Sequence, residues 1–361
     1  MYLIAKKLGI KTLMFNVTPF KGWHYLTQCL FSNDNSSNLF ERENLSPESL
    51  TKFKEQSVFP YNNKTYVIPY YMKNQFKSDK KNKIVPNIKK IIRPTFVRLG
   101  LLKNNNMRKS WQHNAFNYYG VNSLVSSFYY HRLSVNYKKS LIQNHLKNTL
   151  KNKPDEASLG RYIYVPLHYQ PEATTAPLGG YFSDQIYMLE KLRDTLPEDV
   201  SIIVKEHYSQ FSDSLYGFRG RYLSYWDKIN KLKNTYIVPM DYDSRKLILN
   251  SLAVATVTGT TGWEAIQFNK HCIIFGAPWY EDYPGLIHYD KNFKYNIEKV
   301  LNETKPVDYV EEFLLKFSRS LVYTDIHNYS NGEVPRNTDI VVNAINDFCN
   351  SNNKGKENNV N

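Results

Sequence analysis

Apolar and polar positions divide the chain into an irregular first part and a regular second part. From residue 161 onwards, short runs that are apolar throughout alternate with segments whose apolar residues recur at helical spacing. The apolar runs predict strands at 161–167, 201–205, 235–238, 253–258 and 272–275. The segments between them predict helices at 183–193, 244–249 and 261–268, and two more helices follow at 307–322 and 338–349. Such strands, alternating with helices, indicate a parallel sheet covered on both faces.

The first 155 residues are less regular. The pattern predicts a helix over 1–8 that ends at Gly9, and then a buried strand over 11–15. A helix followed by a strand is half of an α/β repeat, so we expect an α/β domain whose opening piece lies outside the sequence. We place domains at 1–155 and 156–350, with an amphipathic helix at 138–153 before the boundary. The polar residues 351–361 are expected to be a disordered tail.

Charge is concentrated in one segment of the first domain. The chain carries a net charge of +14, and residues 73–109 hold twelve basic side chains and a single acidic one. This basic segment is suited to nucleic acid, anionic lipid or an acidic glycan, or it is simply a solvated face. The three cysteines have no metal-ligand spacing and favour a reducing compartment. Without a long apolar run or a signal peptide, the expected location is the cytoplasm.

Ligands of parallel sheets bind where the strands end, so the turns that follow the strands are the candidate site. The first turn, after the strand at 161–167, is unusually long and carries His168, Gln170 and Glu172. Asp184 lies at its far end, where the next helix begins. The second turn is Lys205-Glu206-His207, which is suited to phosphate or a sugar acid. Both turns are also compatible with an ordinary polar surface.

The third turn has the most specific pattern. A strand leads through Gly259, Thr260, Thr261 and Gly262 into a helix that carries Glu264. Glycines let a phosphate approach the backbone, the helix start offers N–H groups to an anion, and Thr hydroxyls add donors. Glu264 is placed to accept hydrogen bonds from a ribose, although an ordinary capped helix would have the same pattern. The spacing of a Walker motif is absent.

These motifs, taken in order, resemble those of the capsular polysaccharide synthesis family, which includes bacterial transferases that attach Kdo from CMP-Kdo. The matching segments are YVPLHYQPEATT, LGGYFSDQIYMLEKL, VKEH, ATVTGTTGWEA and FGAPWY. The resemblance implies a GT-B architecture, with two Rossmann-like domains facing a cleft. It also implies an acceptor-side first domain, a second domain that binds the nucleotide-sugar donor, and transfer without a metal or another cofactor.

The resemblance also assigns roles to single residues. His207 matches the His of a His-Pro pair that holds the donor phosphate, although position 208 is Tyr. Thr260 and Thr261 match a hydroxyl pair, and Glu264 matches a carboxylate that holds the nucleotide. Together with the charge of the turns, this predicts donor contacts from the remaining polar and glycine positions, His168, Gln170, Lys205, Glu206, Gly259 and Gly262.

The sequence therefore predicts a glycosyltransferase that moves a sugar, with a CMP donor favoured, onto a capsular or surface polysaccharide. The expected catalytic residues are Glu172, His207 and Asp184, with Glu172 preferred over Asp184 as the base. The basic segment would contact an anionic membrane surface or the acceptor at the inner face of the cell membrane. The alternatives are a sugar-nucleotide epimerase or hydrolase of the same fold and a non-catalytic binder of anionic glycan or RNA.

Overall fold

The computed structural model describes residues 2–28, 39–42, 44–58, 124–150, 159–172, 174–212, 215–302, 305–324 and 337–357. The basic segment 73–109, on which the membrane prediction rests, lies outside these residues. Within the described part of the chain, no helix combines the length and the apolar character that a membrane span requires.

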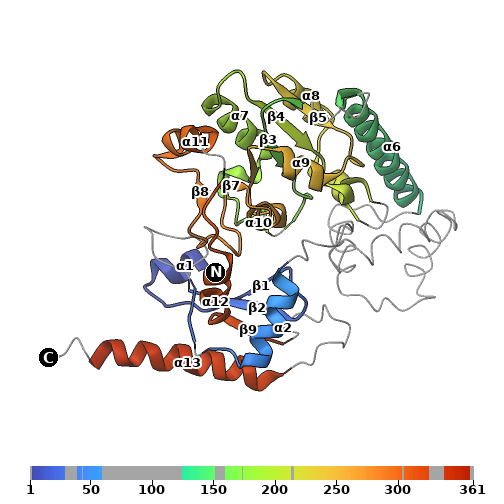
Figure 1. Cartoon of the computed structure of the whole chain (residues 1–361). Helices are drawn as coiled ribbons and strands as arrows, with labels where there is room; N and C mark the ends of the chain where they lie inside the picture. The colour runs from blue at the N-terminus through green and yellow to red at the C-terminus, as the bar shows by residue number, and fades with distance from the viewer. Residues whose placement is uncertain are drawn as a thin grey trace.

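The larger sheet has six parallel strands in the order β5-β4-β3-β6-β7-β8 (Figure 1). The strands are β3 (Tyr162–Pro166), β4 (Ser201–Lys205), β5 (Thr235–Val238), β6 (Ala253–Thr256), β7 (His271–Ile274) and β8 (Leu286–His288). The first five confirm the predicted strands, and β8 was missed because only three residues form it. The order reverses between β3 and β6, so the switch point of the sheet lies between these two strands.

Helices cover both faces of this sheet, which explains why its strands are apolar throughout. Four helices pack on one face: α6 (Leu124–Asn148), α7 (Gln185–Thr195), α8 (Tyr225–Asn230) and α11 (Phe293–Asn302). Two pack on the other face: α9 (Ser244–Asn250) and α10 (Thr260–Gln267). Short 3-10 helices follow the strand ends: η2 (Gly180–Ser183), η3 (Tyr208–Phe211) and η4 (Gly217–Gly220).

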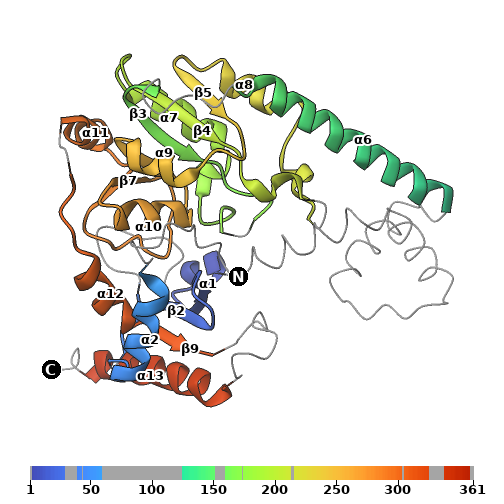
Figure 2. The same ribbon diagram turned by 45° about the vertical axis from the view of Figure 1, so that its right-hand side comes forward.

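The smaller sheet has three antiparallel strands, β1 (Met14–Val17), β2 (Trp23–Thr27) and β9 (Leu321–Tyr323). It lies among α1 (Tyr2–Lys7), α2 (Pro47–Ser57), α12 (Val310–Ser318) and α13 (Thr338–Glu357) (Figure 2). The predicted parallel α/β arrangement is therefore wrong for the described residues before 59, because β1 pairs with β2 as a hairpin. The single helix predicted at 307–322 is instead α12 followed by β9.

An aromatic core joins the smaller sheet to the larger one. Trp263 of α10 and Trp279, in the turn after β7, pack with Phe20, Phe53 and Phe317 in one buried cluster. The indole Nε1 of Trp263 donates to the backbone oxygen of Ser57, at 3.0 Å. The turn at 276–280 is thus a packed loop whose aromatic side chains, Trp279 and Tyr280, are buried.

Candidate donor site at the switch point

The three predicted turns follow β3, β4 and β6, which are neighbours in the sheet. Because these strands are parallel, their carboxyl ends lie at the same edge, on either side of the switch point. The turns also contact one another: the hydroxyl of Thr258 donates to the backbone oxygen of Thr174, at 3.0 Å. The structure therefore brings the predicted residues together at the edge where α/β sheets bind ligands.

His168 holds two of these turns together. Its Nε2 lies 3.0 Å from the hydroxyl oxygen of Thr256 and accepts the N–H of Thr258, at 3.3 Å. Burial is the main cause that lowers the pKa of His168 to about 3, and His207 and Arg221 act in the same direction, so the ring is neutral and carries its proton on Nδ1. The residue as a whole is 6% exposed. His168 was predicted to contact the donor, but its role here is to position the backbone of the third turn.

Glu206 is also an internal residue. Its two carboxylate oxygens accept hydrogen bonds from Nε and a terminal nitrogen of Arg221, both at 2.9 Å, and another from the indole of Trp226. Arg221 in turn donates to the backbone oxygen of His168, at 2.9 Å. The prediction that Glu206 contacts the donor is therefore wrong, because its carboxylate is buried and its hydrogen-bonding capacity is used within the protein.

His207 presents a hydrogen-bond donor. Its Nδ1 accepts the N–H of Ser209, at 3.1 Å, so the proton of the neutral ring lies on Nε2. Burial is the main cause that lowers the pKa of His207 to about 4; Glu206 opposes this, and Arg221 and Lys205 add to it. Near neutral pH the residue is thus an uncharged N–H donor. No hydrogen bond from a described residue occupies its Nε2.

Lys205 supplies positive charge beside these groups. Its Nζ donates to the backbone oxygen of Tyr242 and to the hydroxyl of Ser244, both at 2.6 Å. These contacts fix the ammonium group at the end of β4. Its charge acts on His207 and on Glu264, whose pKa values it lowers. Lys205 therefore contributes an electrostatic field to the site from a fixed position.

The start of α10 is open to an anion. Gly259 is its N-cap and provides no side-chain hydrogen bond, and the carbonyl of Gly259 accepts the hydroxyl of Tyr280, at 2.5 Å. Thr260 and Thr261 are half-buried, and among the described residues nothing bonds to their hydroxyls. Backbone N–H groups at a helix start carry partial positive charge. These two residues can therefore offer N–H and hydroxyl donors to one phosphate.

Glu264 lies one turn further along α10, half-buried at the same edge. Burial raises the pKa of its carboxyl to about 7, while the charge of Lys205 acts in the opposite direction. No described residue donates a hydrogen bond to this carboxyl. A half-buried carboxylate without a partner is costly for a fold and is typical of a functional site.

Close packing requires a glycine at position 262. A Cβ atom at this position would lie 2.1 Å from the hydroxyl oxygen of Tyr280 and 2.8 Å from Sγ of Cys272. Glycine is therefore required because α10 packs closely on the turn after β7. Packing thus accounts for the glycine at position 262, and the phosphate contact predicted there stays a prediction. Gly259, at the N-cap, lies at the open helix start.

The long loop after β3 distributes its predicted residues differently. Glu172 is exposed as a residue, but the protein atoms around its carboxyl group raise the pKa of that group, and a hydrogen bond with Thr174 partly offsets the rise. Gln170 exchanges backbone hydrogen bonds with the amide of Gln210, and its own Nε2 is buried without a partner among the described residues. Asp184 caps α7 by accepting the N–H of Ile186, at 3.0 Å. Asp184 therefore has a structural role at the start of α7, and the catalytic role predicted for it stays a prediction.

Three buried residues of the site were missed from the sequence. Arg221 joins the ends of β3 and β4, and Gln185 accepts the N–H of His168 at 2.6 Å. Gln210 joins the β3 loop, through Gln170, to η4, through the backbone oxygen of Gly217. All three act through backbone groups far away in sequence, so no local spacing could have revealed them. Among the described residues, no group of three or more His, Cys, Asp and Glu side chains is arranged to hold a metal ion.

A family model described as capsule polysaccharide biosynthesis protein matches residues 88–316, which include β3 to β8 and all three turns. The chain belongs to this family. Membership confirms the predicted resemblance and agrees with the observed α/β class. No curated protein sequence matches the chain.

The chain is also similar to solved structures. Two are of Thermosulfurimonas dismutans KpsC, as β-Kdo 2,7 transferase and as β-Kdo 2,4 transferase; each is 14% identical, with a TM-score of 0.32. The matches cover 54% and 59% of this chain, and the chain spans 57% and 62% of theirs. A third is the S. aureus MnaA–UDP structure, 16% identical with a TM-score of 0.29, covering 53% of this chain and 51% of that one.

Proposed function

We propose that this protein is a glycosyltransferase that transfers a sugar from a nucleotide donor to a polysaccharide of the capsule or cell surface. The observation that carries the proposal is the open start of α10, where Thr260 and Thr261 lie one turn from the unpartnered carboxyl of Glu264. A phosphate beside a ribose needs this combination of donors and an acceptor. The family to which the chain belongs supports the choice of a capsular glycan.

In this proposal the phosphate next to the sugar accepts hydrogen bonds from Thr260, Thr261 and Nε2 of His207. Lys205 adds positive charge, and Glu264 accepts the ribose hydroxyls. An acceptor hydroxyl oxygen attacks the anomeric carbon, and the bond from that carbon to the phosphate oxygen breaks. Glu172 takes the hydroxyl proton, while the nucleotide leaves with the bonding electrons. Donors fixed in advance around a leaving phosphate are usually the largest catalytic contribution.

Nucleotide binding is the first test. Thermal-shift titrations with CMP, CDP, UDP and GDP, with CMP favoured, identify the nucleotide, because a ligand at a hundred times its dissociation constant adds about 2.7 kcal/mol of stability. Glu264→Ala should abolish the shift. Glu298→Ala, on an exposed position of α11, is the matched control and should leave it unchanged. Wild-type nucleotide binding by Glu264→Ala would overturn the site assignment.

Transfer is the second test. Radiolabelled donor is incubated with and without a capsular oligosaccharide, and the products are separated. Glycosyl transfer requires the acceptor, whereas an epimerase or hydrolase alters the donor without it. His207→Ala and Glu264→Ala should both lose transfer while their melting curves remain cooperative. Donor turnover that is independent of every acceptor would replace the transferase proposal with the epimerase or hydrolase alternative.

We also propose that the basic segment 73–109 holds the protein at the inner, anionic surface of the cell membrane. Its support is the local excess of twelve basic residues over one acidic residue. Each basic residue near such a surface contributes about 1 kcal/mol to the free energy of membrane binding. In vesicle flotation with phosphatidylserine, changing Lys89, Lys90 and Arg93 to Glu should release the protein. Undiminished flotation of this variant would refute the membrane contact.

A further inference from the structure

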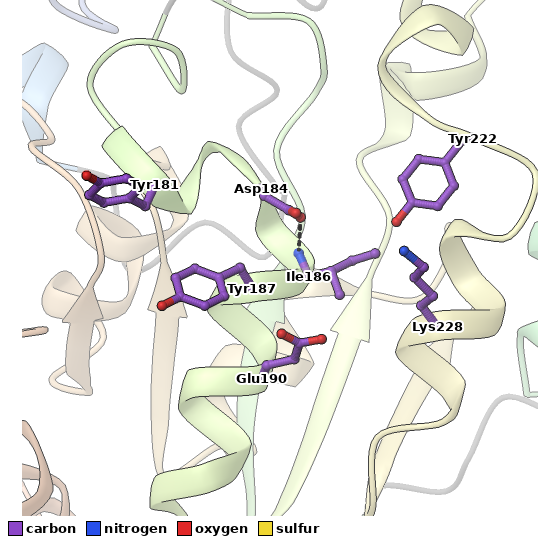
Figure 3. Close-up of a pocket in the computed structure, with 7 residues that line it drawn as sticks. All are labelled: Tyr181, Asp184, Ile186, Tyr187, Glu190, Tyr222 and Lys228. Carbon is purple, nitrogen blue, oxygen red and sulfur yellow. Dashed lines mark hydrogen bonds between the residues drawn. The ribbon is translucent and has the colours of Figure 1, made fainter.

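A pocket of about 440 Å³ lies beside the candidate donor site, between the start of α7 and the chain around α8 (Figure 3). Its wall combines three tyrosines, Tyr181, Tyr187 and Tyr222, with two carboxylates and one ammonium group, from Asp184, Glu190 and Lys228. In Figure 3, Tyr222 and Lys228 face Tyr187 and Glu190 across the pocket. Pockets of this volume are of the size that binds small ligands.

The three tyrosines are exposed although they are large aromatic residues. Tyr181 is 89% exposed, Tyr222 40% and Tyr187 39%. Exposed aromatic side chains that gather around one hollow indicate a binding surface, whereas scattered ones do not. A tyrosine ring can pack against the C–H groups on one face of a pyranose, while its hydroxyl stays hydrated. The wall is therefore suited to a sugar ring.

The polar groups of the pocket are suited to hydroxyl groups. Asp184 uses one carboxylate oxygen for the N–H of Ile186, and the other oxygen can still accept. No described residue bonds to the carboxylate of Glu190. The Nζ atom of Lys228 lies 5.0 Å from the ring centroid of Tyr222, on the same side of the pocket. The pocket thus provides several acceptors for sugar hydroxyls and a positioned donor.

Charge decides which kind of sugar fits. The pocket carries two carboxylates and one ammonium group, so its net charge is negative. A sugar acid or a phosphate would be repelled, in contrast to the start of α10, where helix N–H groups and Lys205 favour an anion. The wall therefore favours an uncharged sugar and disfavours a second copy of the anionic donor.

The position of the pocket relates it to the donor site. Asp184 precedes Gln185, which binds the backbone of His168, and Tyr222 follows Arg221, which binds His168 and Glu206. The buried residue of each pair, Gln185 or Arg221, fixes the ends of β3 and β4. The other residue, Asp184 or Tyr222, lines the pocket. A glycan that reaches the donor from this side would place one of its more distant units against the tyrosines.

We infer that the pocket is a subsite for an uncharged sugar unit of the acceptor glycan, a role that rests on the proposed transferase function. The subsite holds the acceptor glycan in place without taking part in the chemical step. Because it binds a unit away from the reacting hydroxyl, loss of the subsite should raise the KM for acceptor and leave nucleotide affinity unchanged.

The test uses the full chain and saturation-transfer NMR with maltotetraose, cellotetraose and chitotetraose as neutral probes and oligogalacturonate as the acidic probe. At least one neutral probe should bind, and oligogalacturonate should not compete with it. Tyr181→Ala and Tyr187→Ala should each weaken binding by about three- to tenfold, the loss expected for one ring contact. Tyr295→Ala, at an exposed tyrosine of α11, is the matched control and should bind as the wild type does.

Nucleotide titrations on the same variants separate this inference from the proposed function. If the protein binds nucleotide but none of the neutral sugars, the subsite proposal is overturned. It is also overturned if a neutral sugar binds equally well after the tyrosine substitutions. Preferential binding of oligogalacturonate overturns it as well. If the wild type binds no nucleotide but binds a neutral sugar through the tyrosines, the donor site is overturned instead, and the pocket remains a glycan-binding site.

Discussion

Arg221 and Glu206 form a two-point ion pair whose side chains are 1% and 0% exposed, and this pair links the ends of β3 and β4. Removing one partner leaves an uncompensated charge in the interior. Arg221→Met should therefore lower the free energy of unfolding by about 3–5 kcal/mol. Urea denaturation at neutral pH measures the change.

The matched control for that change is Lys233→Met. Lys233 pairs with Glu198 at the surface, where both side chains are largely exposed and water screens the charges. This variant should unfold at the same urea concentration as the wild type. If the two substitutions changed the free energy of unfolding equally, the buried pair of Arg221 and Glu206 would contribute no more to stability than a surface pair does.

Glu264 should make the protein less stable as the pH rises. The pKa of its carboxyl is raised from 4.5 to about 7 in the folded state, so the folded protein holds this proton more tightly than the unfolded chain does. The resulting stabilisation is complete below the unfolded pKa and is lost as the pH rises through about 7. Glu264→Gln mimics the neutral acid and should gain about 1–3 kcal/mol over the wild type at about pH 8.

The same comparison at about pH 4 should show no difference, because both states of the wild type then carry the proton. Glu298→Gln, at an exposed carboxyl, should behave as the wild type does throughout. A constant difference between Glu264→Gln and the wild type at every pH would mean that packing, and not the proton, distinguishes them.

His207 should remain uncharged over the physiological range. Burial lowers the pKa of its ring to about 4, and the N–H of Ser209 fixes the tautomer with the proton on Nε2. Its ring resonances in NMR should therefore not titrate between about pH 5.5 and 8, where an ordinary histidine does. Titration near pH 6.5 would exclude the neutral donor and favour a cationic contact with phosphate.

A side-chain exchange can test the hydrogen bond itself. The amide nitrogen of Gln reaches the position of Nε2, so His207→Gln should keep part of the nucleotide affinity. His207→Ala should lose about tenfold or more, because a hydrogen bond to a charged group contributes about 1.5–3 kcal/mol. Equal affinities of the two variants would show that Nε2 donates nothing to the nucleotide.

Gly262→Ala should destabilise the protein because of packing. The new methyl group would lie 2.1 Å from the hydroxyl oxygen of Tyr280, and overpacking of this kind costs about 1–3 kcal/mol. Adding Tyr280→Phe removes that oxygen and should recover part of the loss in thermal unfolding. If Gly262→Ala instead left stability unchanged and abolished nucleotide binding, the glycine would serve the ligand, as the sequence alone suggested.

The sequence predicted the larger sheet well because each of its first five strands is a local apolar run with a recognisable helix nearby. It also identified the three turns that the structure brings together at one edge, since the turns after β3, β4 and β6 stand out by their polar residues. It did not reveal which polar residues face inwards. Glu206 and His168 look like ligand contacts in isolation, and only Arg221 and Thr256, distant in sequence, show that they are internal.

The smaller sheet shows a different reason for failure. Its central strand β2 pairs on one side with the neighbouring β1 and on the other with β9, so that Tyr25 lies opposite Leu321. Periodicity can predict a strand, but it carries no information on a partner that arrives from the other end of the chain. The short β9 also looked like the last turn of a helix, because its three residues continue the apolar spacing of α12.

The late pairing of β9 has a consequence for folding during synthesis. The ribosome completes β1 and β2 long before β9 leaves the exit tunnel. The edge of β2 that pairs with β9 therefore stays unpaired while the larger sheet forms. Contacts between such distant segments form slowly, and an unpaired edge invites association with other chains. The nascent protein should therefore depend on chaperones until β9 has been synthesised, and fragments that end before β9 should aggregate even when their larger sheet is complete.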